Sequence, residues 1–181
     1  ETLAILRGEL ADQLQAFELI PARAVRYVLR HIPASKFPLA VESPWYVLLE
    51  LASARDQSLT DEQLTDLLGR CLQQELVQDG VVARSEAQRN DVWRLRHCIS
   101  EAQKSAGASI KHDISVPVSA MPEFLQQANK LVTARVPGIR PVPFGHLGDG
   151  NLHYNVSQPI DMSGADFLAL WEQLNEIVHT L

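Results

Sequence analysis

Cysteine is scarce in this chain, which has only Cys71 and Cys98 among its 181 residues. Two cysteines exclude a disulfide framework and suit a reducing compartment, so we expect a cytoplasmic location. Cys98 follows His97 within a predicted helix. An ordinary half-buried thiol is a commoner interpretation of such a residue than a nucleophile.

A surplus of positive charge is also absent. The formal net charge is −6, and the 16 Lys and Arg residues form no basic cluster. Binding to nucleic acid or to an anionic membrane surface is therefore not expected. No hydrophobic run reaches the roughly 18 residues that span a bilayer, and the start of the chain is not signal-like. With 46% hydrophobic residues, the chain is predicted to form one globular domain with a sizeable core.

Both ends of the sequence lie inside helical patterns. The chain begins at Glu1 rather than methionine, within a leucine pattern over residues 3–14, and stops at Leu181 inside another pattern with no capping glycine. Natural domains seldom stop in this way. We therefore interpret residues 1–181 as a single domain excised from a larger protein.

The spacing of apolar residues predicts an α+β fold. Helices are expected over 2–14, 22–29, 60–76 (with Thr60 as N-cap), 85–100, 119–135 and 167–178. Strands are expected over 16–20, 45–51, 81–83, 109–116, 139–144 and 152–156, and the strand 45–51, apolar on both faces, is expected to be central. Two β-α-β units, Ala16 to Leu51 and Val81 to Val116, are compatible with a ferredoxin-like sandwich, with helices on one face of an antiparallel sheet.

A glycine-rich stretch, Pro143 to Asn155, reads as two strands joined by a tight turn. Asp149-Gly150 fits the central positions of a type I′ turn, in which both residues have positive φ. Pairing outward from this turn places His146 opposite His153. By strand alternation His146, His153 and Asn155 share one face of the hairpin.

The two histidines of this hairpin have two interpretations. Directly paired Cβ atoms lie roughly 4.5–5.5 Å apart, which lets two imidazoles converge on one metal ion. The alternative is a half-buried cross-strand pair. Gly145, Gly148 and Gly150 favour the first interpretation, because glycines in strands mark a close approach by another group. A phosphate cradle is not indicated, since neither GxxxxGK[ST] nor a helix-opening GxGxxG is present.

Two further segments carry groups able to bind an anion. Trp93, Arg96 and Ser100 are spaced i, i+3 and i+7, so one helix face presents all three, although a core tryptophan beside a solvated arginine has the same spacing. Along 109–116, alternation places Lys111 on one face with Asp113 and Ser115, and His112 on the other face. The alternative interpretation of Lys111 is a solvated surface charge that binds nothing.

The stretch Gly145-His146-Leu147-Gly148-Asp149-Gly150-Asn151-Leu152-His153 resembles the GHxGDGNxH signature of the C-terminal domain of FAD-linked oxidases, the D-lactate dehydrogenase, glycolate oxidase and D-2-hydroxyglutarate dehydrogenase type. Trp93 to Arg96 is similar to the WxxR segment of that family, and Lys111 to Pro117 to its K-x-D-[ILV]-S-[LV]-P strand. His97 departs from the family, which usually has Glu there. The resemblance covers most of the chain and implies the same ferredoxin-like fold.

The resemblance also implies a chemistry, the oxidation of a D-2-hydroxy acid to a 2-oxo acid by hydride transfer to FAD. A divalent metal, zinc by expectation, would act as a Lewis acid on the substrate hydroxyl. The flavin-binding domain and the family's further acidic metal ligand match nothing in this chain, so the chain alone is expected to be inactive. The residues implied to act are Arg96, Ser100, Lys111 and Asn155 at the substrate, Asn151 at the cofactor, and His146 and His153 at the metal.

The implied partners are a small 2-hydroxy acid and the protein's own FAD-binding domain. A homodimer and a peripheral position at the inner membrane are left open. The competing hypothesis is a non-catalytic, ferredoxin-like module that binds a small acid through the same arginine and histidines.

Overall fold

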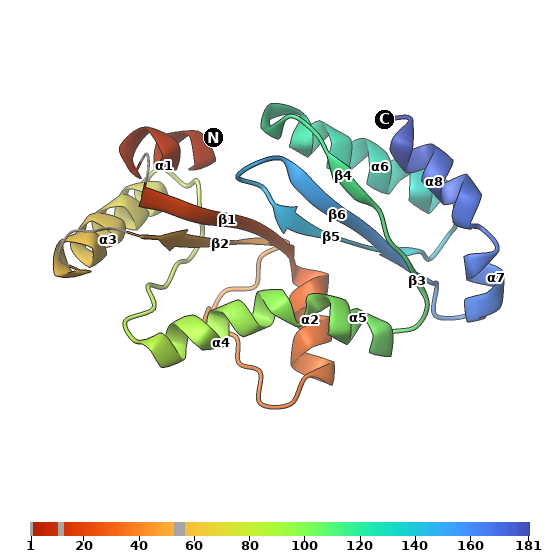
Figure 1. Cartoon of the computed structure of the whole chain (residues 1–181), viewed down its shortest axis with the longest axis horizontal. Coiled ribbons are helices and arrows are strands. Elements are labelled where there is room, and N and C mark those ends of the chain that lie inside the picture. The colour runs from red at the N-terminus through yellow and green to blue at the C-terminus, as the bar shows by residue number, and fades with distance from the viewer. Residues whose placement is uncertain (1, 11–12, 53–56) are drawn as a thin grey trace.

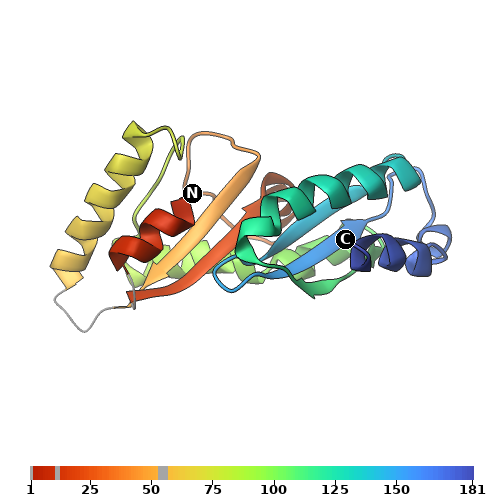
Figure 2. The same cartoon turned by 90° about the horizontal axis from the view of Figure 1, so that it is seen from above.

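The computed structural model describes residues 2–10, 13–52 and 57–181, which form helices and an open antiparallel sheet (Figures 1 and 2). The helices are α1 (Thr2–Leu10), α2 (Ala22–His31), α3 (Gln57–Gln73), α4 (Glu86–His97), α5 (Ile99–Ser105), the 3₁₀ turn η2 (Val118–Ala120), α6 (Met121–Arg135), α7 (Gly164–Leu168) and α8 (Trp171–His179). The strands are β1 (Leu14–Pro21), β2 (Trp45–Leu51), β3 (Ser109–Ile110), β4 (Asp113–Ser115), β5 (Arg140–His146) and β6 (Asn151–Ser157). The predicted α+β class with an antiparallel sheet is confirmed.

The strand order is β2-β1-β5-β6-β3, and β4 also pairs with β6. β5 and β6 form the glycine hairpin and share a long ladder, whereas β1 and β5 are joined through only two pairs, Glu18 with His146 and Leu19 with Gly145. The end of the hairpin therefore lies against the middle of β1. This junction brings residues from both ends of the sequence together.

Helices cover both faces of the sheet, which corrects the prediction of helices on one face. Leu19 packs with α6 and α8, whereas the next residue, Ile20, packs with α2 and α5. Adjacent strand residues point to opposite faces, so two helical layers are required to bury them. Phe17, on the same face as Leu19, packs with α1 and α3. We call the face under α2, α4 and α5 the polar face, because the buried charged residues lie there, and the other the apolar face.

The two predicted β-α-β units are not formed. Residues 81–83 are not a strand, and β1 and β2 are antiparallel neighbours, whereas a β-α-β unit requires parallel strands. After α2, the proline-containing loop returns to the start of that helix, where the Ala22 N–H donates to the Pro44 carbonyl at 3.0 Å. β2 thus begins beside the end of β1. The ferredoxin-like connection expected from these units is not reproduced in the described part of the chain.

Strand β2 is an edge strand, which corrects its prediction as a central one. Its outer residues Trp45 and Val47 are 36% and 44% exposed. Both predicted faces are apolar, but only one has a continuous helical cover, so hydrophobicity alone did not distinguish edge from centre.

Several boundaries also differ. The predicted strand 109–116 is divided into β3 and β4, and the predicted helix through Ser100 breaks at Cys98 between α4 and α5. Thr60 lies inside α3 rather than at its N-cap, whereas Ser85 does cap α4, accepting from the Gln88 N–H. None of the described helices is long and apolar enough to cross a membrane.

Candidate functional site

The hairpin register differs by two residues from the predicted one. His153 pairs with Phe144 rather than with His146, and Asn155 pairs with Val142. The type I′ turn is also absent, because Gly150 has positive φ but Asp149 does not. Instead a longer loop forms, in which the His146 carbonyl accepts from the N–H groups of both Asp149 and Gly150 at 3.1 Å.

Close backbone contacts explain the longer loop. A Cβ on Gly145 would lie 2.6 Å from the Asn151 carbonyl oxygen, and one on Gly150 would lie 2.2 Å from that of Val116. Beyond Phe144, β5 leaves β6 and pairs with β1. The glycines thus permit a crowded junction of three strands, and the simple two-residue turn was the wrong model for it.

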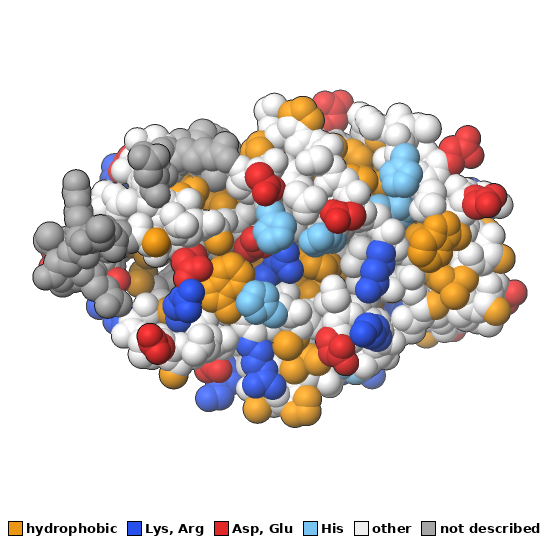
Figure 3. All heavy atoms as spheres, in the orientation of Figure 1, with side chains coloured by type: hydrophobic (Ala, Val, Ile, Leu, Met, Phe, Trp, Pro, Cys, Tyr) orange, Lys and Arg blue, Asp and Glu red, His pale blue; other side chains and the backbone are white. Residues whose placement is uncertain are grey.

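A shift of two residues preserves the face of every side chain. His146, His153 and Asn155 therefore still share one face, as predicted, and the ring centroids of the two histidines are 6.0 Å apart. Phe144 lies beside them, with its ring centroid 5.1 Å from that of His153. Figure 3 shows histidine side chains gathered at the middle of one side of the molecule, between acidic and basic groups.

Glu18 of β1 and Arg96 of α4 form a buried ion pair on the same face. Glu18 is 2% exposed and Arg96 is 8% exposed, and Arg96 Nε donates to Glu18 Oε2 at 2.6 Å. The second carboxylate oxygen, Oε1, is 2.5 Å from Nδ1 of His146. The Arg96 guanidinium also lies over the Phe144 ring, with Cζ 4.8 Å from its centroid. Arg96, predicted as an anion-binding group, is therefore connected to one of the two histidines through the Glu18 carboxylate.

His153 has a carboxylate beside its Nδ1 as well. Asp113, opposite it in the β4–β6 ladder, places Oδ1 3.4 Å from that nitrogen. The pKa of His153 is lowered from its ordinary value, chiefly because burial disfavours the charged imidazolium, with the nearby Arg96 adding to this and Asp113 opposing it. The neutral imidazole is thus favoured, and neutral imidazole is the form that binds metals.

Asn155 is buried and belongs to a polar row along β6. Its Nδ2 donates to Gln103 Oε1 at 3.0 Å, and Gln103 Nε2 donates in turn to Ser157 Oγ at 3.0 Å. Gln103, on α5, is completely buried. The amide of Asn155 is therefore held in one orientation by a second amide.

The β3 and β4 pairings to β6 follow one register, which places Lys111 across from Asn155 and His112 across from Tyr154. Lys111 is exposed, on the side of the polar face. His112 is buried on the opposite face, where Nδ1 donates to the Tyr154 carbonyl at 2.7 Å and the ring contacts His179. The predicted alternation is confirmed, and His112 is not a third ligand beside the hairpin histidines.

The remaining predicted residues lie around this cluster. Ser100 is half-buried in α5, so it no longer continues the helix that carries Arg96, although the two helices follow end to end (Figure 1). Asn151 Nδ2 donates to Asp113 Oδ1 at 2.9 Å, so Asn151 orients the carboxylate beside His153.

A metal ion is implied by the family resemblance, and the donor set fits it in part. Each histidine has a carboxylate at Nδ1, an arrangement common in metal sites, which leaves Nε2 for coordination. Zinc normally takes at least three protein ligands, and within the described ranges no third His, Cys, Asp or Glu completes a group with these two. The described residues offer an oriented pair of potential ligands rather than a complete site.

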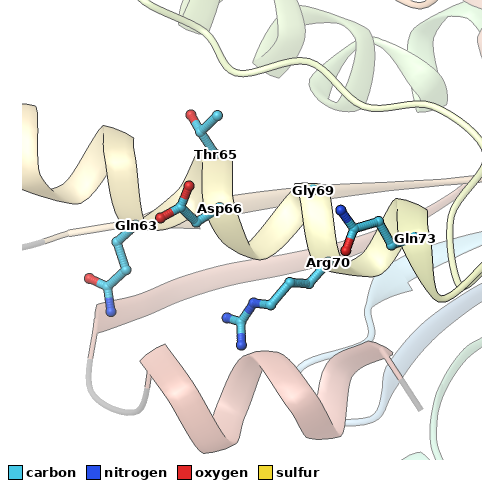
Figure 4. A pocket seen from close by; sticks show the side chains of 6 residues that line it. All are labelled: Gln63, Thr65, Asp66, Gly69, Arg70 and Gln73. Atoms are coloured by element: carbon cyan, nitrogen blue, oxygen red, sulfur yellow. The ribbon is translucent and has the colours of Figure 1, made fainter.

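Two surface hollows lie elsewhere. One, of about 500 Å³, is lined by residues of α3, including Asp66, Gly69 and Arg70 (Figure 4), and Arg70 is already paired with Glu9. The other, of about 470 Å³, lies beside α4 and is lined in part by Glu50, Trp93 and His97. His97 stacks on Trp93, with the ring centroids 5.1 Å apart, so its ring packs against the tryptophan of the same helix. Neither hollow contains the hairpin histidines.

Sequence reasoning missed Glu18, Gln103 and the role of Asp113. A signal for Glu18 was present, because an acidic residue in the apolar strand Ala16-Phe17-Glu18-Leu19-Ile20 must be paired if it is buried. Its partners are 78 and 128 residues away, and no local spacing reveals such contacts.

Known proteins resemble this chain over almost its full length. Residues 3–181 match the family model for FAD linked oxidases, C-terminal domain. The D-2-hydroxyglutarate dehydrogenase of Xanthomonas citri pv. viticola is 37% identical over 178 residues, covering 98% of this chain and 36% of that protein. The enzyme of that name from Stutzerimonas stutzeri is 36% identical over 167 residues, covering 91% of this chain and 35% of that protein.

A plant relative, the mitochondrial D-2-hydroxyglutarate dehydrogenase of Arabidopsis thaliana, is 35% identical over 153 residues, covering 83% of this chain and 26% of that protein. The chain thus spans between about a quarter and about a third of the length of these relatives. The match of the family model to nearly every residue confirms the resemblance seen in the glycine hairpin. The chain belongs to the FAD linked oxidases, as their C-terminal domain.

Proposed function

We propose that the whole protein is a flavin-dependent dehydrogenase that oxidises a D-2-hydroxy acid, and that residues 1–181 form its substrate- and metal-binding domain. One observation carries the proposal. A buried arginine and two histidines, contributed by α4, β5 and β6, lie on one face, where the Glu18 carboxylate pairs with both Arg96 and His146 and the His153 ring lies beside that of His146. An anion-binding group beside two potential metal ligands is the arrangement that a hydroxy acid requires.

Arg96 is the proposed anchor for the substrate carboxylate. Within the described residues its side chain hydrogen-bonds only to Glu18, through Nε, which leaves the terminal nitrogens for an anion. A guanidinium grips a carboxylate through two parallel hydrogen bonds, which fixes orientation as well as position. Because the guanidinium lies over the Phe144 ring and its Nε is paired with Glu18, the arginine is held in place before substrate binds.

Lys111 and Asn155 are proposed to complete the substrate pocket, together with Ser100. Lys111 lies across from Asn155 in the strand register, and it supplies a second positive charge. The Gln103 amide fixes the Asn155 amide, so that Asn155 presents a preset hydrogen-bonding group. The names of the relatives favour D-2-hydroxyglutarate, a dicarboxylate, as the acid to test first.

His146 and His153 are proposed to hold a divalent metal, zinc by preference, through their Nε2 atoms. When bound, such an ion acts as a Lewis acid and lowers the pKa of a coordinated hydroxyl group. A further ligand must come from outside the residues described, since these provide only two.

FAD is proposed to be bound mainly by a separate domain, with Asn151 at the rim of the shared pocket. The flavin supplies the hydride acceptor, and this domain supplies orientation and electrostatics. Cytoplasmic location and a homodimer remain predictions, and several relatives carry the word mitochondrial in their names.

Anaerobic flavin reduction in the full-length protein tests this function. Mixing with D-2-hydroxyglutarate or D-lactate should bleach the oxidised flavin absorbance, whereas the L enantiomers should not. Arg96→Ala should bleach far more slowly at subsaturating acid. A full-length protein that binds no flavin, or whose flavin responds to no 2-hydroxy acid, contradicts the proposal.

A further inference from the structure

Glu18 lies in the middle of β1, and its carboxylate is almost completely buried. A buried carboxylate is tolerated only where it is paired and hydrogen-bonded. Both oxygens of Glu18 are used, Oε2 by Arg96 Nε at 2.6 Å and Oε1 by His146 Nδ1 at 2.5 Å. One carboxylate therefore connects the proposed substrate anchor to a proposed metal ligand.

The contact with Glu18 selects one edge of the Arg96 guanidinium. Because Nε donates to Glu18, an incoming carboxylate is directed to the terminal nitrogens Nη1 and Nη2. Arg96 Cζ also lies over the Phe144 ring, 4.8 Å from its centroid. These two contacts restrain the guanidinium and leave its terminal nitrogens for an incoming anion.

The contact with Glu18 also sets the protonation pattern of His146. A carboxylate oxygen accepts hydrogen bonds, so Nδ1 of His146 must carry the proton. The lone pair of the neutral ring then lies on Nε2. A carboxylate that fixes a histidine in this way is a recurrent feature beside bound metals.

A second Glu–Arg pair joins the same helix to the sheet and has no such connection. Glu50 of β2 pairs with Arg89 of α4 at the surface, and Glu50 forms no hydrogen bond to a histidine among the described residues. This pair supplies a matched control for the general effect of breaking an ion pair between α4 and the sheet.

We infer that Glu18 is a positioning residue, whose single carboxylate aligns the carboxylate-binding edge of Arg96 with the metal-binding nitrogen of His146. The inference rests on the proposed function. It goes further by assigning the coupling of the two subsites to one residue that contacts neither substrate nor metal.

Glu18→Gln in the full-length, flavin-loaded protein is the main test. An amide has only one acceptor group, so it cannot accept from both Arg96 and His146. Cobalt(II), titrated by its visible absorption, should bind about 10- to 100-fold more weakly, as for other changes beside metal ligands. At saturating metal, kcat for D-2-hydroxyglutarate should fall by about 10- to 100-fold through misalignment. KM should stay constant or fall, because Arg96 loses its neutralising partner. Glu50→Gln should change none of these quantities.

Glu18→Asp covers the case in which the glutamine variant does not fold. It retains the charge that Arg96 needs, but the shorter side chain cannot reach both partners, so cobalt affinity and kcat should fall in the same way.

Nitrogen-15 histidine spectra of the metal-free wild-type protein, with the His146 signal assigned by its loss in His146→Asn, should show a proton on Nδ1. A proton on Nε2 overturns the inference without any change at Glu18.

The outcomes separate this inference from the proposed function. If His146→Ala binds cobalt as tightly as wild type, the metal assignment itself fails. If His146→Ala loses cobalt while folded Glu18→Gln and Glu18→Asp keep wild-type affinity and kcat, then only the role of Glu18 is refuted. A fall in KM accompanied by a fall in kcat supports positioning, whereas a stability loss with wild-type kinetics shows a structural ion pair.

Discussion

The two faces of strand β6 are built from opposite chemistry. Leu152, Tyr154 and Val156 point into a hydrophobic core against α6 and α8. His153 and Asn155, which alternate with them, point toward β1 and α5, where charged and amide groups are buried. Both faces are covered by helices, so burial alone does not distinguish them. What differs is the partner that each side chain meets.

The difference shows how a sheet keeps stability and chemistry apart. Apolar contacts stabilise without direction, whereas each buried polar group needs a specific partner. The apolar face therefore tolerates small adjustments, and the polar face is sensitive to single atoms. Changes on the apolar face should alter unfolding, and changes on the polar face should alter binding and turnover.

The largest stability effect is expected from Leu152→Ala on the apolar face. Leu152 is 1% exposed, and deleting a fully buried leucine costs about 2–5 kcal/mol. Urea denaturation of the 181-residue chain measures this loss. His153→Ala, one residue away and half-buried, is the matched variant and should lose far less. Equal losses would show that the two faces do not divide stability from chemistry.

Arg96→Lys should have the next largest effect, on substrate binding. Lysine retains the charge but not the bidentate grip, and loss of a charged hydrogen bond costs about 1.5–3 kcal/mol, or roughly 10- to over 100-fold in KM. Steady-state kinetics of the full-length protein with D-2-hydroxyglutarate provide the measurement. Arg89→Lys, in the exposed pair with Glu50, serves as the control. A wild-type KM for Arg96→Lys would show that the arginine is structural.

His112 gives the apolar face a pH dependence. Burial lowers the pKa of His112 below its ordinary value, so the unfolded chain binds more protons below about pH 6.5. The stabilisation is therefore present above that pH and is lost as the pH falls toward the folded-state pKa, by at most about 1.4 kcal/mol per pH unit. The free energy of unfolding, measured by denaturation between pH 5 and 7, should depend less steeply on pH for His112→Gln than for the wild-type chain. An unchanged slope would mean that the pKa of His112 is the same in the folded and unfolded states.

Tyr154→Phe is expected to have the smallest effect. The Tyr154 hydroxyl donates to Asn129 Oδ1 at 2.9 Å, and a hydrogen bond of this kind contributes about 0.5–1.5 kcal/mol. The ring remains in place, so the apolar packing is preserved. A loss much above this range, measured by urea denaturation, would show that the apolar face also depends on single polar contacts.

Local patterns predicted much of this arrangement. Alternation correctly assigned the faces of His146, His153 and Asn155, and it separated His112 from Lys111, because a period of two survives a register shift of two. The turn type and register were wrong, since they depend on how closely Gly145 and Gly150 approach backbone from elsewhere in the chain. Such contacts are set by tertiary structure.

Contacts between residues far apart in the chain could not be predicted from local sequence patterns for the same reason. Glu18 and His146 are 128 residues apart, and their meeting requires β1 to lie beside β5. The edge position of β2 and the helices on both faces likewise follow from strand order, which hydrophobic patterns do not encode. Long-range pairing is therefore the step at which the site was incompletely predicted.

Anomalous X-ray diffraction at the zinc edge, on crystals of the full-length protein, tests the central claim most directly. The account predicts one strong peak about 2.0–2.1 Å from Nε2 of both His146 and His153, on the polar face. Nδ1 of His146 should remain on Glu18. A metal bound elsewhere, or bound through Nδ1 of His146, would contradict the account.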